Sequence, residues 1–455
     1  HPAEVAVAGG VVVGLGEPGD YQARQVDDLE GAYLLPGFIE GHIHLESAMV
    51  RPEEFTRAVL PLGCTSVVYD PHEVANVLGL EGIIYMHRVS QGLPVDFFAM
   101  LPSCVPSSPL ETAGAELAAS DIAPMLAEDW VLGLGEMMNF PGVLNRDAEV
   151  LARVDAGRFK RVDGHAPLLS GKRLNAYVAA GIRSDHESTG LEEAREKLRK
   201  GMHVMVREGS TEKNLDALLP LLKDESGRRC MFVSDDRNPL DLMRGLHLVD
   251  SVRRAMAAGV SPMLAVRMVT INPAEYFGLH DRGALAPGLL ADMVVVGDLK
   301  TMDVRRVYKR GVPVASEGQV HDFEPGHPKT YLRGSINVRW IEPEDFYIPA
   351  NGRRARVIEV VPGQIITRPA ADEVKALGGR ALADPDRDML KIAVIERHRG
   401  SGRTALGFVR GFGMKRGAIA SSIAHDAHNI VVVGADDSDM FEAAVRIVKQ
   451  NGGVV

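Results

Sequence analysis

Several kinds of residue and segment are scarce in this chain of 455 residues, and each scarcity argues against a class of protein. The chain has three cysteines, Cys64, Cys104 and Cys230, an odd and sparse number that excludes a disulfide scaffold and fits a reducing compartment. Three thiolates are also too few for an all-cysteine structural zinc site. No apolar run approaches the roughly 18 residues of a membrane span, and no basic segment marks a signal peptide. We therefore expect a cytoplasmic protein that binds no membrane.

Basic residues are also in the minority. The 61 Asp and Glu residues outnumber the 51 Lys and Arg residues, which gives a net charge of −10. Binding to nucleic acid requires a basic face that replaces the counterions of the phosphates, so we expect no general nucleic-acid binding. Aromatic residues are few at 5%, whereas the 45% of hydrophobic and 25% of charged residues are ordinary for a globular protein.

Short apolar runs alternate with helical segments between residues 34 and 283. Helices are predicted at 52–62, 170–180 and 189–200, and a glycine follows each of them. The apolar runs predict eight buried strands, at 34–44, 64–70, 95–101, 130–136, 160–166, 181–187, 202–208 and 229–236. Eight βα units in about 250 residues predict an α/β fold of the (β/α)8 TIM-barrel type, with an open doubly wound sheet as the alternative.

Two further domains are predicted outside the barrel, which we place at 34–283. Residues 1–33 and 284–320 are rich in Val and Gly and predict a small, discontinuous β-sandwich-like domain. Residues 321–455 predict a C-terminal α/β domain with strands near 391–396 and 429–433. Residues 14–19 match a dinucleotide-binding fingerprint literally, but Pro18 is unsuitable and no helical pattern follows, so we expect a turn there.

Polar residues collect where the predicted strands end. In a barrel, these C-terminal strand ends form one rim, and the rim holds the active site. The residues that we expect to converge there are His42, His44, Asp70, Glu136, His165, His186, Glu208 and Asp235.

Six of these residues have the chemistry of metal ligands, and Asp235 is considered separately below. His42 and His44 lie two positions apart on one strand, so both imidazoles point to the same face, about 7 Å apart, and can share a metal. Glu136 ends another strand, where its carboxylate can bridge two cations. His165 and His186 end the next two strands and predict a second metal.

An aspartate follows the last strand. Asp235 and Asp236 both come after an apolar run, and periodicity does not settle which of them faces the site. We favour Asp235, because an Asp there can bind one metal and take a proton from its bound water.

Two other polar clusters stay open. Asp70 and Glu73 have the spacing of a capping box, so Asp70 is either a helix cap or, with His72 and Glu73, part of a substrate or extra cation site. His425 begins a His-Asp-Ala-His cluster that either forms a polar turn or reaches the barrel mouth.

The strand-end residues belong to segments that resemble a known family. Residues 36–44, PGFIEGHIH, resemble the opening signature of the amidohydrolase superfamily. Further segments resemble its adenine deaminase family: 45–79, 162–188, 205–222, 233–243 and 416–434. The resemblance covers most of the chain.

The resemblance implies a binuclear metal enzyme that hydrolyses adenine to hypoxanthine and ammonia in purine salvage. His42, His44, Glu136 and Asp235 would hold one cation, and Glu136, His165 and His186 the second. The family implies Mn²⁺ or Fe²⁺ rather than Zn²⁺. Asp235 would take the proton of the attacking hydroxide.

The donor of the proton to N1 of adenine is open among Glu73, Glu187 and Glu208, which are candidates by position only. We expect adenine as the small-molecule partner and a homo-oligomer, a dimer. The alternatives are an amidohydrolase that acts on a different aminopurine or cyclic amide, and a metal-binding interaction protein without catalysis.

Overall fold

A computed structural model describes residues 3–223, 225–324, 332 and 334–455. The chain folds into two compact units and passes between them several times. The first unit comprises His1–His72, Ile83–Cys104 and Ala118–Lys329, and the second comprises Glu73–Gly82, Val105–Leu117 and Thr330–Val455. The three-domain division at 33/34, 283/284 and 320/321 stays a prediction.

Eight parallel strands follow one another around the first unit. They are β4 (Phe38–Ile43), β5 (Cys64–Tyr69), β6 (Asp96–Leu101), β7 (Val131–Met137), β8 (Arg161–Gly164), β9 (Ser184–Asp185), β10 (His203–Arg207) and β11 (Cys230–Val233). Strands β4 to β8 pair in chain order, and β9, β10 and β11 pair likewise. Between the two groups, Arg183 N–H donates to Val162 O at 3.0 Å, and Asp235 N–H donates to His42 O at 3.0 Å. These bonds close the circle, so the TIM-type barrel is confirmed.

One predicted strand was wrong. The run 34–44 contains two strands, because β3 (Tyr33–Pro36) pairs with β12 (Met293–Val296) in a separate antiparallel sheet before β4 enters the barrel. Gly37 separates them, and its N–H donates to Asp292 O at 2.7 Å. A Cβ at Gly37 would lie 2.2 Å from Thr65 Oγ1, so the crossing requires glycine.

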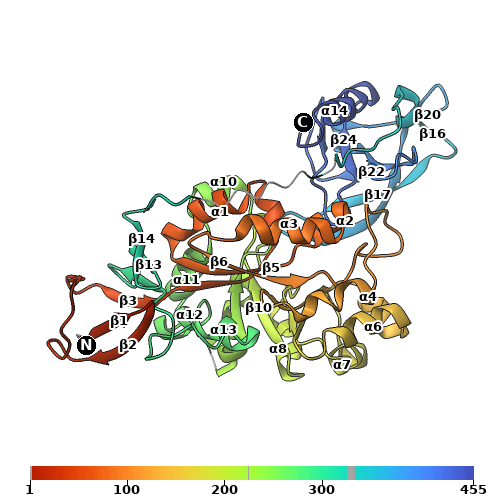
Figure 1. Cartoon of the computed structure of the whole chain (residues 1–455). Coiled ribbons are helices and arrows are strands. Elements are labelled where there is room, and N and C mark those ends of the chain that lie inside the picture. Colours follow the sequence, from red (N-terminus) through yellow and green to blue (C-terminus); the bar gives the residue numbers. More distant parts are fainter. Residues whose placement is uncertain (1–2, 224, 325–331, 333) are drawn as a thin grey trace. The chain divides into compact units, whose positions relative to one another are not determined.

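Helices surround the barrel strands (Figure 1). The predicted helices appear as α1 (Pro52–Val59) with a 3-10 turn at Leu60–Leu62, α7 (Gly171–Ala179) and α8 (Leu191–Arg199). The others up to α13 are α2 (His72–Leu78), α3 (Leu80–Ser90), α4 (Ala119–Ile122), α5 (Phe140–Asn145), α6 (Ala148–Ala156), α9 (Leu215–Leu218), α10 (Pro239–Met243), α11 (Leu248–Ala257), α12 (Pro262–Arg267) and α13 (Ile271–Phe277).

The barrel is a packed core. Inward-facing side chains such as Ile39, Met205 and Met231 fill its interior, while Val252 of α11 packs on the outer face of the strands together with Phe232. The burial of both faces explains why these strands appear in the sequence as nearly continuous apolar runs.

Two small sheets complete the first unit. The hairpin of β1 (Glu4–Ala8) and β2 (Val11–Gly16) is one, and β3 and β12 extend the other with β13 (Val304–Lys309), β14 (Val312–Ser316) and β15 (Gln319–Val320). The chain turns after Gly16, where Asp20 N–H donates to Glu17 O at 3.1 Å, and residues 17–32 contain no helix. The expected turn at the false fingerprint is confirmed.

The second unit contains a six-stranded sheet covered by a helix. The strand order is β18 (Thr367–Glu373), β17 (Arg354–Val360), β22 (Thr404–Arg410), β21 (Leu390–Ile395), β24 (Ile430–Gly434) and β23 (Ala418–Ser421). Helix α14 (Asp437–Lys449) packs Met440, Ala444 and Ile447 against Ala393 and Val432 of this sheet. The strands predicted near 391–396 and 429–433 are therefore β21 and β24. A smaller sheet joins β16 (Ile348–Pro349), β20 (Arg380–Leu382) and β19 (Lys375–Leu377).

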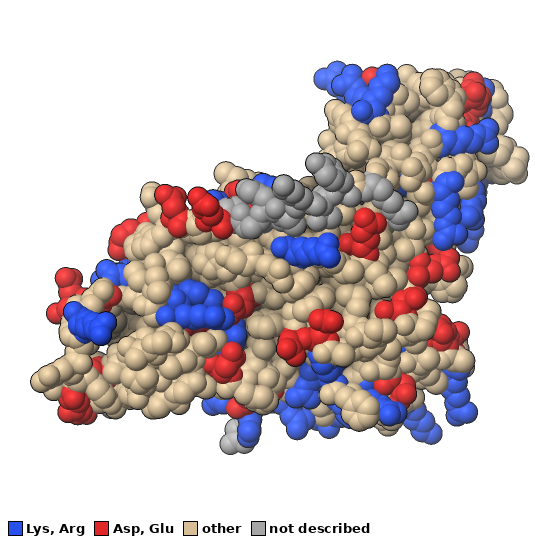
Figure 2. Space-filling view, in the orientation of Figure 1, with Lys and Arg blue, Asp and Glu red and all other residues tan. Residues whose placement is uncertain are grey.

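Two surface properties bear on function. Lys and Arg side chains are interspersed with Asp and Glu side chains on the face shown in Figure 2. Among the described residues, no helix has both the length and the apolar character needed to cross a bilayer.

Candidate metal centre

The rim of the barrel brings together six of the predicted site residues. His42 and Glu136 lie in β4 and β7, and the others directly follow strands: His44 follows β4, His165 follows β8, His186 follows β9, and Asp235 follows β11 after one residue. These residues form three groups, and within each group the potential ligand atoms all lie within 4.8 Å of one another. The groups are His42, His44 and Glu136; His42, His186 and Asp235; and Glu136, His165 and His186. Five of the six residues are buried, and His165 is partly buried.

His44 shows how the surrounding backbone prepares a ligand. Its Nδ1 lies 2.9 Å from the backbone oxygen of Asp70, so Nδ1 carries the proton and donates it. Nε2 is the nitrogen that faces the cluster, and it lies 3.2 Å from Glu136 Oε1 and 3.1 Å from Asp235 Oδ1. A metal-binding imidazole is oriented by this kind of bond on its other nitrogen.

Glu136 occupies the middle of the cluster. Its Oε1 faces His44, while its Oε2 lies 2.5 Å from His165 Nδ1 and 3.0 Å from His186 Nε2. One carboxylate therefore contacts imidazoles on both sides. The rings of His42 and His186 stack with centroids 4.2 Å apart, which brings the two halves of the cluster together.

Asp235, rather than Asp236, faces the cluster. Its Oδ1 lies 3.4 Å from His42 Nε2, and its Oδ2 accepts a hydrogen bond from Arg207 at 2.7 Å. Asp236 instead accepts a hydrogen bond from the Ser47 hydroxyl. Asp235 has a φ of 58°, in the left-handed region that Asp tolerates better than most residues and that is associated with functional sites.

The electrostatics of the cluster fit a cation. Burial raises the pKa of Glu136 and Asp235, but the neighbouring imidazoles more than offset it and hold both pKa values well below the ordinary range. Burial likewise lowers the pKa of His44 and His186, yet the carboxylates raise both well above the ordinary value. The carboxylates thus stay ionised, and within the described chain His42 Nε2 and His186 Nδ1 form no hydrogen bond. Imidazole nitrogens and carboxylate oxygens are the ligands of a divalent metal site, so the residues fit such a group.

Asp70 and His72 lie beside this cluster. Asp70 Oδ2 accepts a hydrogen bond from the Glu136 backbone N–H at 2.9 Å, which fixes the bridging residue. His72 Nδ1 lies 3.4 Å from Glu136 Oε1 and 3.5 Å from Asp70 Oδ1. Asp70 therefore supports a site residue.

Two further predicted residues, Glu208 and Glu73, form hydrogen bonds or ion pairs with residues not considered above. Glu208 accepts hydrogen bonds from Arg254 on Oε1 and from the Leu215 N–H on Oε2 at 3.1 Å, so both of its oxygens are engaged. Within the second unit, Glu73 contacts His425 Nδ1 and lies 3.4 Å from His428 Nε2. The three form a further group with metal-ligating atoms.

The sequence analysis missed Arg207. Its fully buried guanidinium donates to Asp235 and to both carboxylate oxygens of Glu187. Glu187 in turn lies 3.2 Å from His186 Nε2. The available signal was a basic residue at the end of an otherwise apolar strand, because a buried charge of this kind requires a partner.

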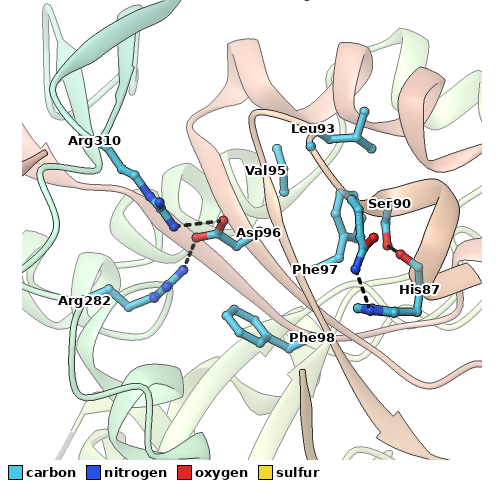
Figure 3. A pocket seen from close by; sticks show the side chains of 11 residues that line it. His87, Ser90, Leu93, Val95, Asp96, Phe97, Phe98, Arg282 and Arg310 are labelled. Carbon is cyan, nitrogen blue, oxygen red and sulfur yellow. Dashed lines mark hydrogen bonds and ion pairs between the residues drawn. The ribbon is translucent and has the colours of Figure 1, made fainter. Parts of the chain in front are cut away.

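A separate cavity of about 290 Å³ opens at the other end of the strands. It is lined by Asp96, the first residue of β6, and Figure 3 shows Arg282 and Arg310 pointing toward that carboxylate. The Arg282 guanidinium donates to Asp96 Oδ2 at 2.6 Å. None of the rim residues lines this cavity.

The chain is similar to known proteins over most of its length. The amidohydrolase family matches residues 33–314, and the adenine deaminase C-terminal domain matches residues 364–455. An adenine deaminase of Desulfatibacillum aliphaticivorans is 49% identical over 452 residues, which cover 99% of this chain and 79% of that protein. An adenine deaminase of Dehalococcoides mccartyi is 47% identical over 455 residues, with shares of 100% and 79%.

Solved structures share the fold at low identity. A crystal structure of an adenine deaminase matches with a TM-score of 0.51 and 17% identity over 71% of this chain and 96% of that chain. A dihydropyrimidinase from Brevibacillus agri matches with a TM-score of 0.53 and 16% identity, with shares of 70% and 92%.

Proposed function

The chain belongs to the amidohydrolase family, among its adenine deaminases, and from this premise we propose that it hydrolyses adenine to hypoxanthine and ammonia at a centre of two divalent cations. The family implies a divalent metal centre, and the buried cluster at the rim supplies suitable ligands. The observation that carries the proposal is the convergence of four imidazoles and two carboxylates from five separate strands.

The contacts suggest how the ligands divide. The first cation would be held by His42, His44, Glu136 and Asp235, and the second by Glu136, His165 and His186. Glu136 would serve both, because its two oxygens face different imidazoles, 3.2 Å and 3.0 Å away. The carboxylate and imidazole donors suit Mn²⁺ or Fe²⁺, which we propose in preference to Zn²⁺, and the cavity of Figure 3 plays no part in this assignment.

When bound, the cations supply a nucleophile at neutral pH by lowering the pKa of a bound water. Asp235 would accept a proton from the water that attacks C6 of adenine, because Oδ1 faces the histidines while Arg207 holds Oδ2. N1 gains a proton as the C6–O bond forms. A second proton then reaches the amino nitrogen, the C6–N bond breaks, and ammonia leaves.

Three glutamates are candidates for the proton at N1. Arg254 and the Leu215 N–H engage Glu208, and Arg207 engages Glu187. Glu73 contacts the imidazoles of His425 and His428. All three glutamates are proposed as candidates by their position in the chain.

The test compares two neighbouring aspartates. Protein stripped with a chelator is reloaded with Mn²⁺ or Fe²⁺ and given adenine, and hypoxanthine and ammonia are measured. Asp235→Asn is expected to lower kcat by about 10³-fold or more, since it removes a proton acceptor and weakens a ligand. Asp236→Asn is the matched control, and it is expected to keep wild-type turnover because Asp236 contacts Ser47.

Two results would contradict the proposal. If the protein holds two cations but turns over no adenine, the assignment of adenine as the substrate is wrong. A panel of other aminopurines and cyclic amides would then be assayed. Protein that takes up no cation would contradict the metal centre itself and favour a non-catalytic interaction protein.

The remaining expectations concern the cell. We propose a cytoplasmic homodimer that serves purine salvage and binds neither nucleic acid nor membrane. Light scattering of the purified protein tests the dimer, since a monomeric mass at micromolar concentration would contradict it.

A further inference from the structure

A buried ion pair lies behind the two histidines assigned to the second cation. Lys197 of α8 and Asp185 of β9 both have fully buried side chains, and Lys197 Nζ lies 2.8 Å from Asp185 Oδ2. The ammonium also donates to Ala166 O at 2.9 Å and to Glu193 Oε1 at 2.8 Å. All three of its protons are therefore used.

Both carboxylate oxygens of Asp185 also accept hydrogen bonds. Its Oδ1 accepts a hydrogen bond from the Ala166 N–H at 3.0 Å. Its Oδ2 accepts further bonds from the Glu187 N–H at 3.1 Å and from the Ser188 hydroxyl at 2.9 Å. The pair thus holds both backbone groups of Ala166 and the first residues of the segment that follows β9.

These hydrogen bonds lie next to the two histidines in the chain. Ala166 directly follows His165, and Asp185 directly precedes His186. The ion pair therefore connects the ends of β8 and β9 at the two positions where the imidazoles project, and it does so outside the cluster. The centroids of the two rings lie 5.4 Å apart, with Glu136 Oε2 in contact with both nitrogens that face the cluster.

The pair is weak evidence for a contribution to stability, because replacement of a buried ion pair by apolar residues of similar volume is often neutral or stabilising. Groups that orient metal ligands from behind commonly change metal affinity 10-fold to 100-fold when they are altered.

We propose that Lys197 and Asp185 are positioning residues that set the spacing of His165 and His186 and thereby the affinity for the second cation. The inference rests on the proposed function, because it takes those two histidines as ligands. Neither residue touches the substrate or the reacting atoms.

The experiment uses the full chain, stripped of metal and titrated with Mn²⁺ by calorimetry and elemental analysis. Lys197→Met alone leaves the Asp185 carboxylate buried without its cation and can prevent folding. The principal variant is therefore the double change Asp185→Asn with Lys197→Met, which removes both charges at nearly constant volume and keeps Oδ1 as an acceptor for Ala166.

The double variant is expected to bind one Mn²⁺ as the wild type does and the other about 10-fold to 100-fold more weakly. Its deaminase activity is expected to return when Mn²⁺ is raised by the same factor, which a general structural defect would not allow. Lys200→Met is the matched control. Lys200 follows the same helix and bonds Glu196 and the Gly171 carbonyl, so both cations are expected to bind with wild-type affinity.

Two outcomes overturn the inference while leaving the proposed function intact: a folded double variant that binds both cations as the wild type does, or one that loses both to the same degree. A wild-type protein that does not bind two cations would instead overturn the proposed function, and the inference with it.

Discussion

His203 makes the stability of the first unit depend on pH. The side chain begins β10 and packs against Tyr276, with ring centroids 4.6 Å apart, and within the described chain its Nδ1 forms no hydrogen bond. Burial, followed by the charges of Arg229 and Arg161, lowers the pKa of His203 to about 4. The imidazole therefore stays neutral in the folded protein at pH 5.

The unfolded chain behaves differently, because an unperturbed histidine has a pKa of about 6.5. Between pH 6.5 and pH 4 the unfolded state binds a proton that the folded state does not, so the free energy of unfolding falls as the pH falls through this window. The full difference of the two pKa values corresponds to about 3 kcal/mol, of which about 2 kcal/mol is already lost at pH 5.

His203→Gln removes this titration. Urea unfolding of metal-free protein, followed by circular dichroism at pH 7 and pH 5, is expected to show a loss of stability that is about 2 kcal/mol smaller for the variant than for the wild type. His280→Gln, at an exposed histidine, is the control for removing an imidazole. Equal losses in the wild type and in His203→Gln would refute the reasoning, since His203 would then titrate alike in both states.

Three further perturbations test other parts of the molecule. Lys309→Met removes the ammonium that bonds the Asp96 and Asp292 carboxylates at 2.7 Å each, and we expect chemical denaturation to show a loss of about 3–5 kcal/mol; an unchanged midpoint would contradict this role. Gly133→Ala places a Cβ 2.1 Å from Arg161 O, between β7 and β8. Thermal unfolding should therefore show that the free energy of unfolding falls by at least about 2 kcal/mol. A wild-type melting temperature would show that the two strands can move apart to accept the Cβ. Saturation of the stripped enzyme with Mn²⁺ should raise its melting temperature, because a ligand that binds only the folded state stabilises it by mass action; no shift would argue against a site preformed at the rim.

The barrel strands could be predicted from sequence for a physical reason. Parallel strands that are buried on both faces require continuous apolar runs, and the polar residue that ends each run marks the point where the strand leaves the core. The ligand candidates His42, His44, Glu136, His165 and His186 were recognised because each stands at such a point. Local order along the chain was enough, since consecutive strands are neighbours in the barrel.

Other features depended on contacts between distant residues. The pairing of β3 with β12, more than 250 residues further along the chain, shows that the run 34–44 divides into two strands. Glu208 looked like an active-site acid because it ends a strand, but its partner Arg254 lies 46 residues away on α11. No local pattern reveals the partner of a buried charge.

The sequence by itself determined which residue types end the strands, and hence which candidate metal ligands the rim carries. The tertiary structure decided how that chemistry is assembled. Asp235, rather than Asp236, faces the cluster because its backbone is left-handed and its carboxylate binds Arg207. The fold also places Lys197 and Asp185 behind two histidines from neighbouring strands. Periodicity describes a side chain relative to its own strand, whereas the direction of a carboxylate and the partner of a buried charge are set by whichever distant segment packs against it.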